Sequence, residues 1–400
     1  MYIYTLTNIL SKIIATLFAI FIVKILPPVE YGIFSVALSY LAIGVAVSDL
    51  GLQQTFTREI NRSKSRSINL FIVSIAIRLL LLITFFPVVY ILTDLKEIYV
   101  MYFCSGLGIL LINVSNAYFI SKNELDKNSW IKAFIIFGLI ISLTISYFHA
   151  ERIKVENVVV MYSFTYLISG VIATIYIIWK DYSRRYNFSI SQVRILLFGV
   201  VSLCGSLLIF SIQPIIGILL TEQLSGLEYS AAYSLSYRFV TISLMVVIIL
   251  SQIHMSKIYK FKGNYSLIRK ETVKQILVNI FLNILITFVL YLILDEFIDL
   301  LLDGKNQDYI DMVMGNFYIT SCLIIISAIS LPLGQQLLAL DKQTERFKCQ
   351  IISLISLIIL IFTLNYLSIV YYAAISLLIA ESILLLLYIL SNYNEKNSTC

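Results

Sequence analysis

Charged residues are scarce in this sequence. They make up 13% of its 400 residues, whereas 60% are hydrophobic, and a soluble domain of this size is roughly a quarter charged. Too few polar side chains remain to cover a water-facing surface, so lipid must replace water over most of the exterior. Apolar segments of about 20 residues, long enough to cross a bilayer as a helix, recur along the chain. The sequence therefore predicts an all-α integral membrane protein.

Histidine and cysteine are also few, which excludes several kinds of site. Only His149 and His254 are present, so a histidine-based metal site is not expected. The five cysteines follow no ligand or disulfide spacing, and four lie in apolar stretches, where cysteine acts as a small hydrophobe. We therefore expect no bound metal and no cofactor.

The apolar runs predict about twelve transmembrane helices. The first run lacks the small-residue cleavage site of a signal peptide and is interpreted as a retained helix. The predicted spans lie near residues 5–26, 33–54, 69–93, 98–120, 130–148, 157–179, 195–220, 229–250, 272–294, 309–333, 349–367 and 369–390.

The basic residues distinguish the two sides of the membrane. Of the 29 lysines and arginines, 21 fall in one set of alternating linkers and the C-terminal tail, 4 in the other linkers and 4 inside spans. Short cytoplasmic loops carry the excess of Lys and Arg, so both termini are expected to be cytoplasmic. The net charge of +6 comes from these short basic linkers, a pattern that reflects membrane topology. It therefore does not indicate a nucleic-acid partner.

An internal similarity indicates a duplication. The sequence VEYGIFSVALSY at 29–40 and the sequence LEYSAAYSLSY at 227–237 share Glu-Tyr and, with one gap, Leu-Ser-Tyr. Six spans separate them, so both copies have the same orientation. We therefore predict two parallel six-helix halves around a central cavity, residues 1–194 and 195–400, a layout found in transporters.

Four short motifs carry a resemblance to a known family. They are LPPVEYG at 26–32, DLGL at 49–52 with TRE at 57–59, LEY at 227–229 with YR at 237–238, and LLALDKQ at 337–343. Together they resemble the Wzx-type O-antigen and capsule flippases of the multidrug/oligosaccharidyl-lipid/polysaccharide superfamily. One departure is the absence of the usual proline after the eighth span, where the chain reads SQIH at 251–254.

The resemblance implies a substrate and a location. The substrate would be an undecaprenyl-diphosphate-linked oligosaccharide repeat unit, moved across the bacterial inner membrane by alternating access. Membrane lipids and the polysaccharide polymerase of the same pathway would be partners.

A diphosphate needs cations in a layer where charge is poorly solvated, and Arg238 is the leading candidate to supply one. It lies in the eighth span on a face with Ser234 and Thr241, and its planar fork suits a phosphate. The alternative is a structural ion pair with Glu228 or Glu381.

Lys12 is the second candidate, on a face with Asn8 and Ala15; it could line a cavity or extend to the cytoplasmic rim. Arg78 and Lys24 are further candidates for which extension to the membrane surface is favoured.

Two acids lie inside spans. Asp49 could pair with Lys12 or relay protons, but a structural cap or ion pair with Arg58 is the favoured interpretation. Glu381 is equally well explained as a coupling-ion site and as an interhelical partner. Among uncharged polar residues, Gln213 and Asn113 are predicted to be interhelical hydrogen-bonding groups.

Two other functions compete with the flippase. A membrane polymerase or ligase would need a sizeable outer loop carrying catalytic groups, and the outer linkers are short. A drug/cation antiporter would need an acidic cavity, whereas the spans contain four basic residues and two acids. The flippase is therefore the preferred prediction, and no enzymatic activity is expected.

Overall fold

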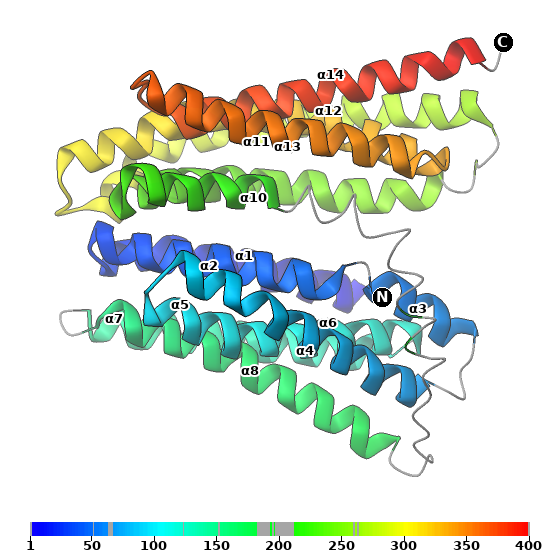
Figure 1. The fold of residues 1–400 in the computed structure, drawn as a ribbon, viewed down its shortest axis with the longest axis horizontal. Coiled ribbons are helices and arrows are strands. Elements are labelled where there is room, and N and C mark those ends of the chain that lie inside the picture. The colour runs from blue at the N-terminus through cyan, green and yellow to red at the C-terminus, as the bar shows by residue number, and fades with distance from the viewer. Residues whose placement is uncertain are drawn as a thin grey trace. The chain divides into compact units, whose positions relative to one another are not determined.

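The computed structural model describes residues 2–50, 52–62, 67–122, 124–150, 153–181, 193, 196, 212–258, 261 and 264–398. These residues form helices joined by short turns (Figure 1). Contacts divide the chain into two compact units, Met1–Ile215 and Ile216–Cys400. The boundary predicted at 194/195 lies outside the described residues and stays a prediction.

Eight α-helices lie in the described part of unit 1 up to residue 181. They are α1 (Tyr2–Ile25), α2 (Pro28–Asp49), α3 (Leu52–Arg62), α4 (Ser67–Leu92), α5 (Lys96–Val100), α6 (Gly106–Ser121), α7 (Leu125–Phe148) and α8 (Val155–Lys180), with a π-helical turn, Met101–Ser105, between α5 and α6. A helix at 212–225 runs across the boundary between the two units. The described part of unit 2 also contains α10 (Leu227–Ile258), α11 (Tyr265–Leu302), α12 (Gln307–Ala339), α13 (Gln343–Tyr366) and α14 (Tyr372–Ser398).

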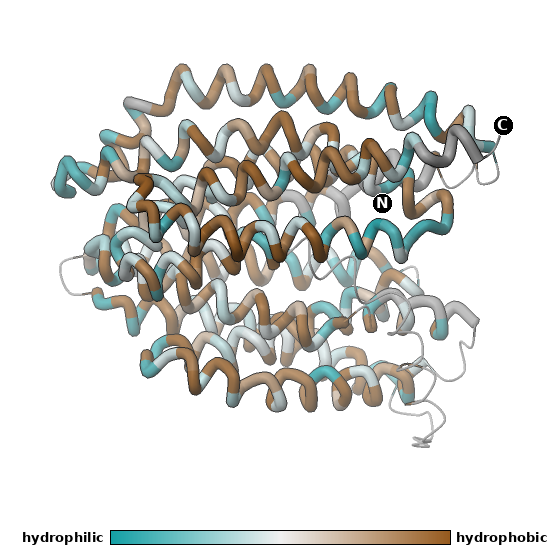
Figure 2. The backbone as a smooth tube through the Cα atoms, turned by 45° about the horizontal axis from the view of Figure 1, so that its top comes forward, coloured by the Kyte–Doolittle hydropathy of each residue, from teal (hydrophilic) through white to brown (hydrophobic). Residues whose placement is uncertain are grey.

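Ten helices in the described part of the chain are long and apolar enough to cross a membrane. Hydrophobic residues run along the middles of the helices and hydrophilic residues gather toward their ends (Figure 2). The span predicted at 195–220 lies mostly outside the described residues, and the eighth predicted span coincides with the longer α10. The predicted all-α multi-pass fold is confirmed.

The boundaries of the second span differ from the prediction. The helix begins at Pro28, where proline is tolerated because its missing N–H would have no partner in the first turn. It ends at Leu50, which adopts a left-handed conformation with φ 36°. The span predicted at 33–54 therefore starts five residues earlier, and its last residues belong to the next helix.

That next helix, α3, was predicted as part of a cytoplasmic linker. Leu52, Phe56 and Ile60 recur every four residues and are buried, and α3 packs against α6 and α4. The linker is thus a short amphipathic helix rather than an extended segment.

Each unit is built around one central helix. In unit 1, α6 packs against α2, α3, α4, α7 and α8, and in unit 2, α12 packs against α10, α11, α13 and α14. The apolar windows of the spans containing α6 and α12 are 61% and 56% buried, whereas that of α11 is 11% buried. Long apolar side chains of α11 therefore face outward from unit 2.

Glycine permits a close contact between two helix backbones in unit 1. A Cβ added to Gly108 of α6 would lie 2.4 Å from the backbone carbonyl carbon of Tyr166, and one added to Gly170 of α8 would lie 2.5 Å from the Gly108 oxygen. The two backbones can approach because neither residue has a side chain, as is common between membrane helices.

Candidate functional site

Arg238 lies within α10, three turns from its start. It is half-buried, and its Nε has no hydrogen-bond partner. Among the described ion pairs, none joins Arg238 to Glu228 or Glu381. On the same helix face, Ser234 is buried and its hydroxyl is also without a partner. Within the described residues, Arg238 is thus a cation without an acidic partner beside a polar hydroxyl, an arrangement that can bind an anion.

Arg78 is placed very differently. Its side chain is 1% exposed and forms an ion pair with Asp49, joining the middle of α4 to the last residue of α2. The remaining guanidinium atoms, Nε and Nη1, have no partner. Arg78 therefore lies inside unit 1, where it pairs with Asp49. The side chain of Arg58, the partner that the sequence favoured for Asp49, lies outside the described residues.

Lys12 lies on an exposed face of α1. This helix packs against α7, where Lys132 is close enough for the two positive charges to interact. Two lysines in this relation repel each other, and an anion bound between them would relieve the repulsion. Lys24 is half-buried in the last turn of α1, and no described contact brings it to Lys12.

Glu381 is buried within unit 2, and its Oε2 has no partner. Its charge interacts with two tyrosines, Tyr237 of α10 and Tyr388 of α14. Two uncharged residues were predicted to join helices. Gln213 is buried and interacts with another residue, and Asn113 is half-buried in α6. Unit 2 therefore holds an acid and a cation, Glu381 and Arg238, that are not paired with each other.

Two features of unit 2 were not predicted. Arg346, in the first turn of α13, is buried against Gly334 and Tyr388, and its Nε lacks a partner. The other is a row of buried amides at four-residue spacing on α11, formed by Gln275, Asn279 and Asn283. The spacing of the row was visible in the sequence, whereas the burial of Arg346 depends on packing of α12, α13 and α14.

A cluster of charged residues lies in unit 1 where α7 begins and α8 ends. Glu124, in the turn before α7, pairs with Lys127 at 3.0 Å and with Lys180 of α8. Burial raises the pKa of the Glu124 carboxyl, but hydrogen bonds from Lys180 and Lys127 outweigh it, so the pKa is lowered overall. The cluster holds α7 to α8. Within the described part of the chain, no three metal-ligating side chains gather.

Comparison with solved structures identifies the fold. An inward-facing multidrug resistance MATE transporter of the MOP superfamily matches with a TM-score of 0.75 at 13% identity, over 99% of this chain and 95% of that chain. The lipid II flippase MurJ in an inward closed conformation matches with a TM-score of 0.69 at 14% identity, over 98% and 87%. A MOP superfamily transporter from Pyrococcus furiosus, whose binding pocket is described as having reverse polarity, matches with a TM-score of 0.67 at 12% identity, over 98% and 94%. This chain therefore has the multi-pass fold of these MOP superfamily transporters, which have about twelve transmembrane helices.

The family follows from the sequence itself. The family described as polysaccharide biosynthesis protein matches residues 1–256, which is more than half of the chain. This chain belongs to that family, of which Wzx-type flippases are the usual members. Among curated protein sequences, none matches this chain.

Proposed function

We propose that this protein is a flippase that moves undecaprenyl-diphosphate-linked oligosaccharide repeat units across a bacterial cell membrane by alternating access. The observation that carries the proposal is the family match to polysaccharide biosynthesis proteins in a chain with a transporter fold. A polysaccharide pathway needs its lipid-linked intermediates translocated, and a lipid II flippase shares this fold.

The charges of the spans support an anionic substrate. Arg238 in unit 2 and Lys12 with Lys132 in unit 1 are cations without a described carboxylate partner. A diphosphate placed against such cations would recover part of the solvation that it loses on leaving water. We assign Arg238 and Lys12 to the substrate, and Arg78 with Asp49 to the framework of unit 1.

A drug/cation antiporter is the second candidate, favoured by the TM-score of the MATE match. It would use Glu381, the buried acid of α14, to bind a cation. The scarcity of acids in the spans relative to cations makes this the weaker candidate.

Transport in proteoliposomes distinguishes the two functions. The purified chain is reconstituted with a fluorescent undecaprenyl-diphosphate oligosaccharide, and the label that moves between leaflets is quenched by an impermeant reductant. We expect translocation above protein-free liposomes and no uptake of a cationic dye under an imposed proton gradient. Dye transport without movement of the lipid-linked glycan would replace the flippase with the antiporter.

The proposed orientation places both termini in the cytoplasm. It is tested with single cysteines at Gln223, near the start of α10, and at Lys342, between α12 and α13, in a cysteine-free background. Both positions lie near helix ends of unit 2. An impermeant thiol reagent added to intact cells should label the cysteine at 223 and spare that at 342. The reverse labelling pattern would contradict this orientation and place both termini outside the cytoplasm.

A further inference from the structure

A cavity of about 230 Å³ opens between α11, α12 and α14. It lies at the end of unit 2 that carries Arg269, Lys270 and Lys342, which we call the basic end of unit 2. Its wall combines a cation, polar side chains and apolar side chains. Arg269 and Tyr265 come from the first turns of α11, and Gln336 and Asn392 come from α12 and α14. The cavity therefore has a polar end, which lies where these three helices begin or finish.

Asn392 forms part of the cavity wall and holds α14 against α12. The residue is 7% exposed, and its Nδ2 donates to the carbonyl oxygens of Tyr388 at 2.8 Å and Leu333 at 3.5 Å. These two acceptors fix the orientation of the amide, and Oδ1 is left without a partner. This oxygen is itself buried, so the amide shapes the wall of the cavity and is not reached by a ligand.

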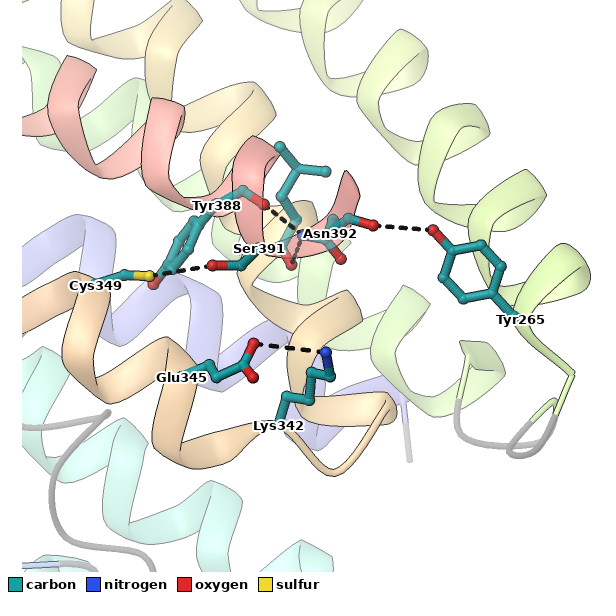
Figure 3. A network of polar contacts seen from close by, with 8 residues as sticks. Tyr265, Lys342, Glu345, Cys349, Tyr388, Ser391 and Asn392 are labelled. Carbon is teal, nitrogen blue, oxygen red and sulfur yellow. Dashed lines mark hydrogen bonds and ion pairs between the residues drawn. The ribbon is translucent and has the colours of Figure 1, made fainter. Parts of the chain in front are cut away.

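The polar end is held together by a contact between helices. Figure 3 shows the Tyr265 ring reaching from α11 toward α14, where its hydroxyl donates to the backbone oxygen of Asn392 at 3.1 Å. Arg269 lies one turn further along α11 and is exposed. No described ion pair includes Arg269, so its guanidinium is available to a ligand.

The other end of the cavity continues onto an apolar surface. Val273 lines the cavity and begins a row of exposed apolar side chains at four-residue spacing on α11, followed by Leu277, Phe281 and Leu285. Residues at this spacing share one helix face. The row is about 18 Å long at the helical rise of 1.5 Å per residue, which suits an extended acyl chain.

We propose that this cavity binds an anionic phospholipid of the phosphatidylglycerol class. The phosphate contacts Arg269, and one acyl chain follows the apolar row from Val273 to Leu285. The basic end of unit 2 is the side that the charge distribution assigns to the cytoplasm, where the leaflet is rich in anionic lipid. The inference does not depend on which substrate is translocated.

The size of the cavity argues against the lipid-linked glycan as its occupant. Pockets that enclose a drug-sized molecule have volumes of about 300–1,000 Å³, and this cavity is smaller. A membrane lipid is therefore a better match in size than a diphosphate carrying several sugars.

The test measures the melting temperature of the purified full-length chain in detergent with added lipid. Dioleoylphosphatidylglycerol is expected to raise it by a few degrees, because a ligand that binds only the folded state stabilises it. Dioleoylphosphatidylcholine and inorganic phosphate should have little effect. Arg269→Ala should weaken the response to phosphatidylglycerol by about tenfold in concentration, the loss expected for one charge-assisted contact.

Lys270→Ala provides the matched control, because Lys270 is an adjacent exposed cation on α11 that does not line the cavity. This variant should respond like the original chain. Val273→Trp should block the cavity without removing a charge and should also abolish the response.

Four results would overturn the proposal. They are an equal response to phosphatidylcholine, an equal response to phosphate alone, an equal loss in Lys270→Ala, and a stronger Arg269-dependent response to undecaprenyl phosphate than to phosphatidylglycerol. The last result would assign the cavity to the lipid carrier of the substrate instead.

Discussion

In unit 1, α2 packs against α4 and α6, and α8 packs against α6 and α7; in unit 2, α10 packs against α11 and α12, and α14 packs against α12 and α13. In these contacts, helices at equivalent places in the two units pack against equivalent neighbours. This repetition is what a duplicated six-helix segment would produce, and it extends beyond the short sequence similarity between 29–40 and 227–237.

The polar groups that hold the helices differ between the units. In unit 1 the second and third spans, α2 and α4, are joined by the buried ion pair of Asp49 with Arg78. The corresponding seam of unit 2, between α10 and α11, is joined by uncharged groups: Gln275 Nε2 donates to the Ser251 hydroxyl at 2.9 Å. One helix arrangement can therefore be stabilised by either chemistry. Arg238, for which no ion pair is found among the described residues, is the charge that we propose for the substrate.

The largest expected effect is on the ion pair of unit 1. Asp49→Asn removes the only described charge partner of Arg78, which is almost fully buried. An uncompensated buried charge costs about 3–5 kcal/mol, and we expect a value near the lower end because the Asp49 side chain is 29% exposed. The abundance of folded protein in the membrane, measured by fluorescence-detected gel filtration, should fall sharply.

The double variant Asp49→Asn/Arg78→Gln should recover much of this loss, because no buried charge is left. The matched substitution in unit 2, Gln275→Leu, should have a much smaller effect. Normal abundance of Asp49→Asn with abolished transport would instead indicate that Asp49 takes part in coupling.

A smaller effect is expected where two helix backbones meet at glycines. Gly108→Ala would place a Cβ 2.4 Å from backbone atoms of α8, and forcing such a contact costs about 1–3 kcal/mol. In unit 2, Gly334→Ala meets side chains rather than backbone, the Tyr388 ring at 3.0 Å and the Arg346 Nε at 3.4 Å, and side chains can shift. The melting temperature should therefore fall more for Gly108→Ala than for Gly334→Ala. Equal losses would show that the two units are packed with equal tightness at these positions.

The smallest effect is expected in the row of amides on α11. Asn279 Nδ2 donates to the Ala328 oxygen at 3.4 Å, whereas neither amide atom of Asn283 has a partner. Hydrogen bonds between membrane helices average about 0.6 kcal/mol, so Asn279→Leu should destabilise slightly and Asn283→Leu should be neutral or stabilising in thermal unfolding. A stable Asn283→Leu variant that fails to transport would give the row a role beyond holding helices.

Much of the fold could be predicted because hydrophobic runs and basic linkers report directly on membrane spans. Where the structure describes them, the apolar runs identified the spans within several residues. The start of α2 at Pro28 was not predicted, although proline is common at the first position of a helix. The amphipathic α3 was missed because its charged residues were interpreted only as topology signals. The repeat of Leu52, Phe56 and Ile60 could have revealed it.

The partners of charged residues could not be predicted in the same way. Asp49 and Arg78 are 29 residues apart and meet because α2 and α4 pack together, which hydropathy does not encode. Lys132 was counted as a cytoplasmic lysine, and its proximity to Lys12 depends on the packing of α1 against α7. Pairing in the interior is a property of helix packing, so the sequence could name candidate cations but could not say which are neutralised.

Arg238 is the residue on which the account of transport depends. The decisive measurement is translocation of the fluorescent undecaprenyl-diphosphate oligosaccharide by matched amounts of reconstituted Arg238→Ala and Arg238→Lys. Losing one charge-assisted contact costs roughly 1.5–3 kcal/mol, so Arg238→Ala should lose about ten- to a hundredfold in apparent affinity, and Arg238→Lys should retain partial activity. Undiminished transport by Arg238→Ala, or its rescue by removing Glu228 or Glu381, would contradict the assignment of Arg238 to the substrate.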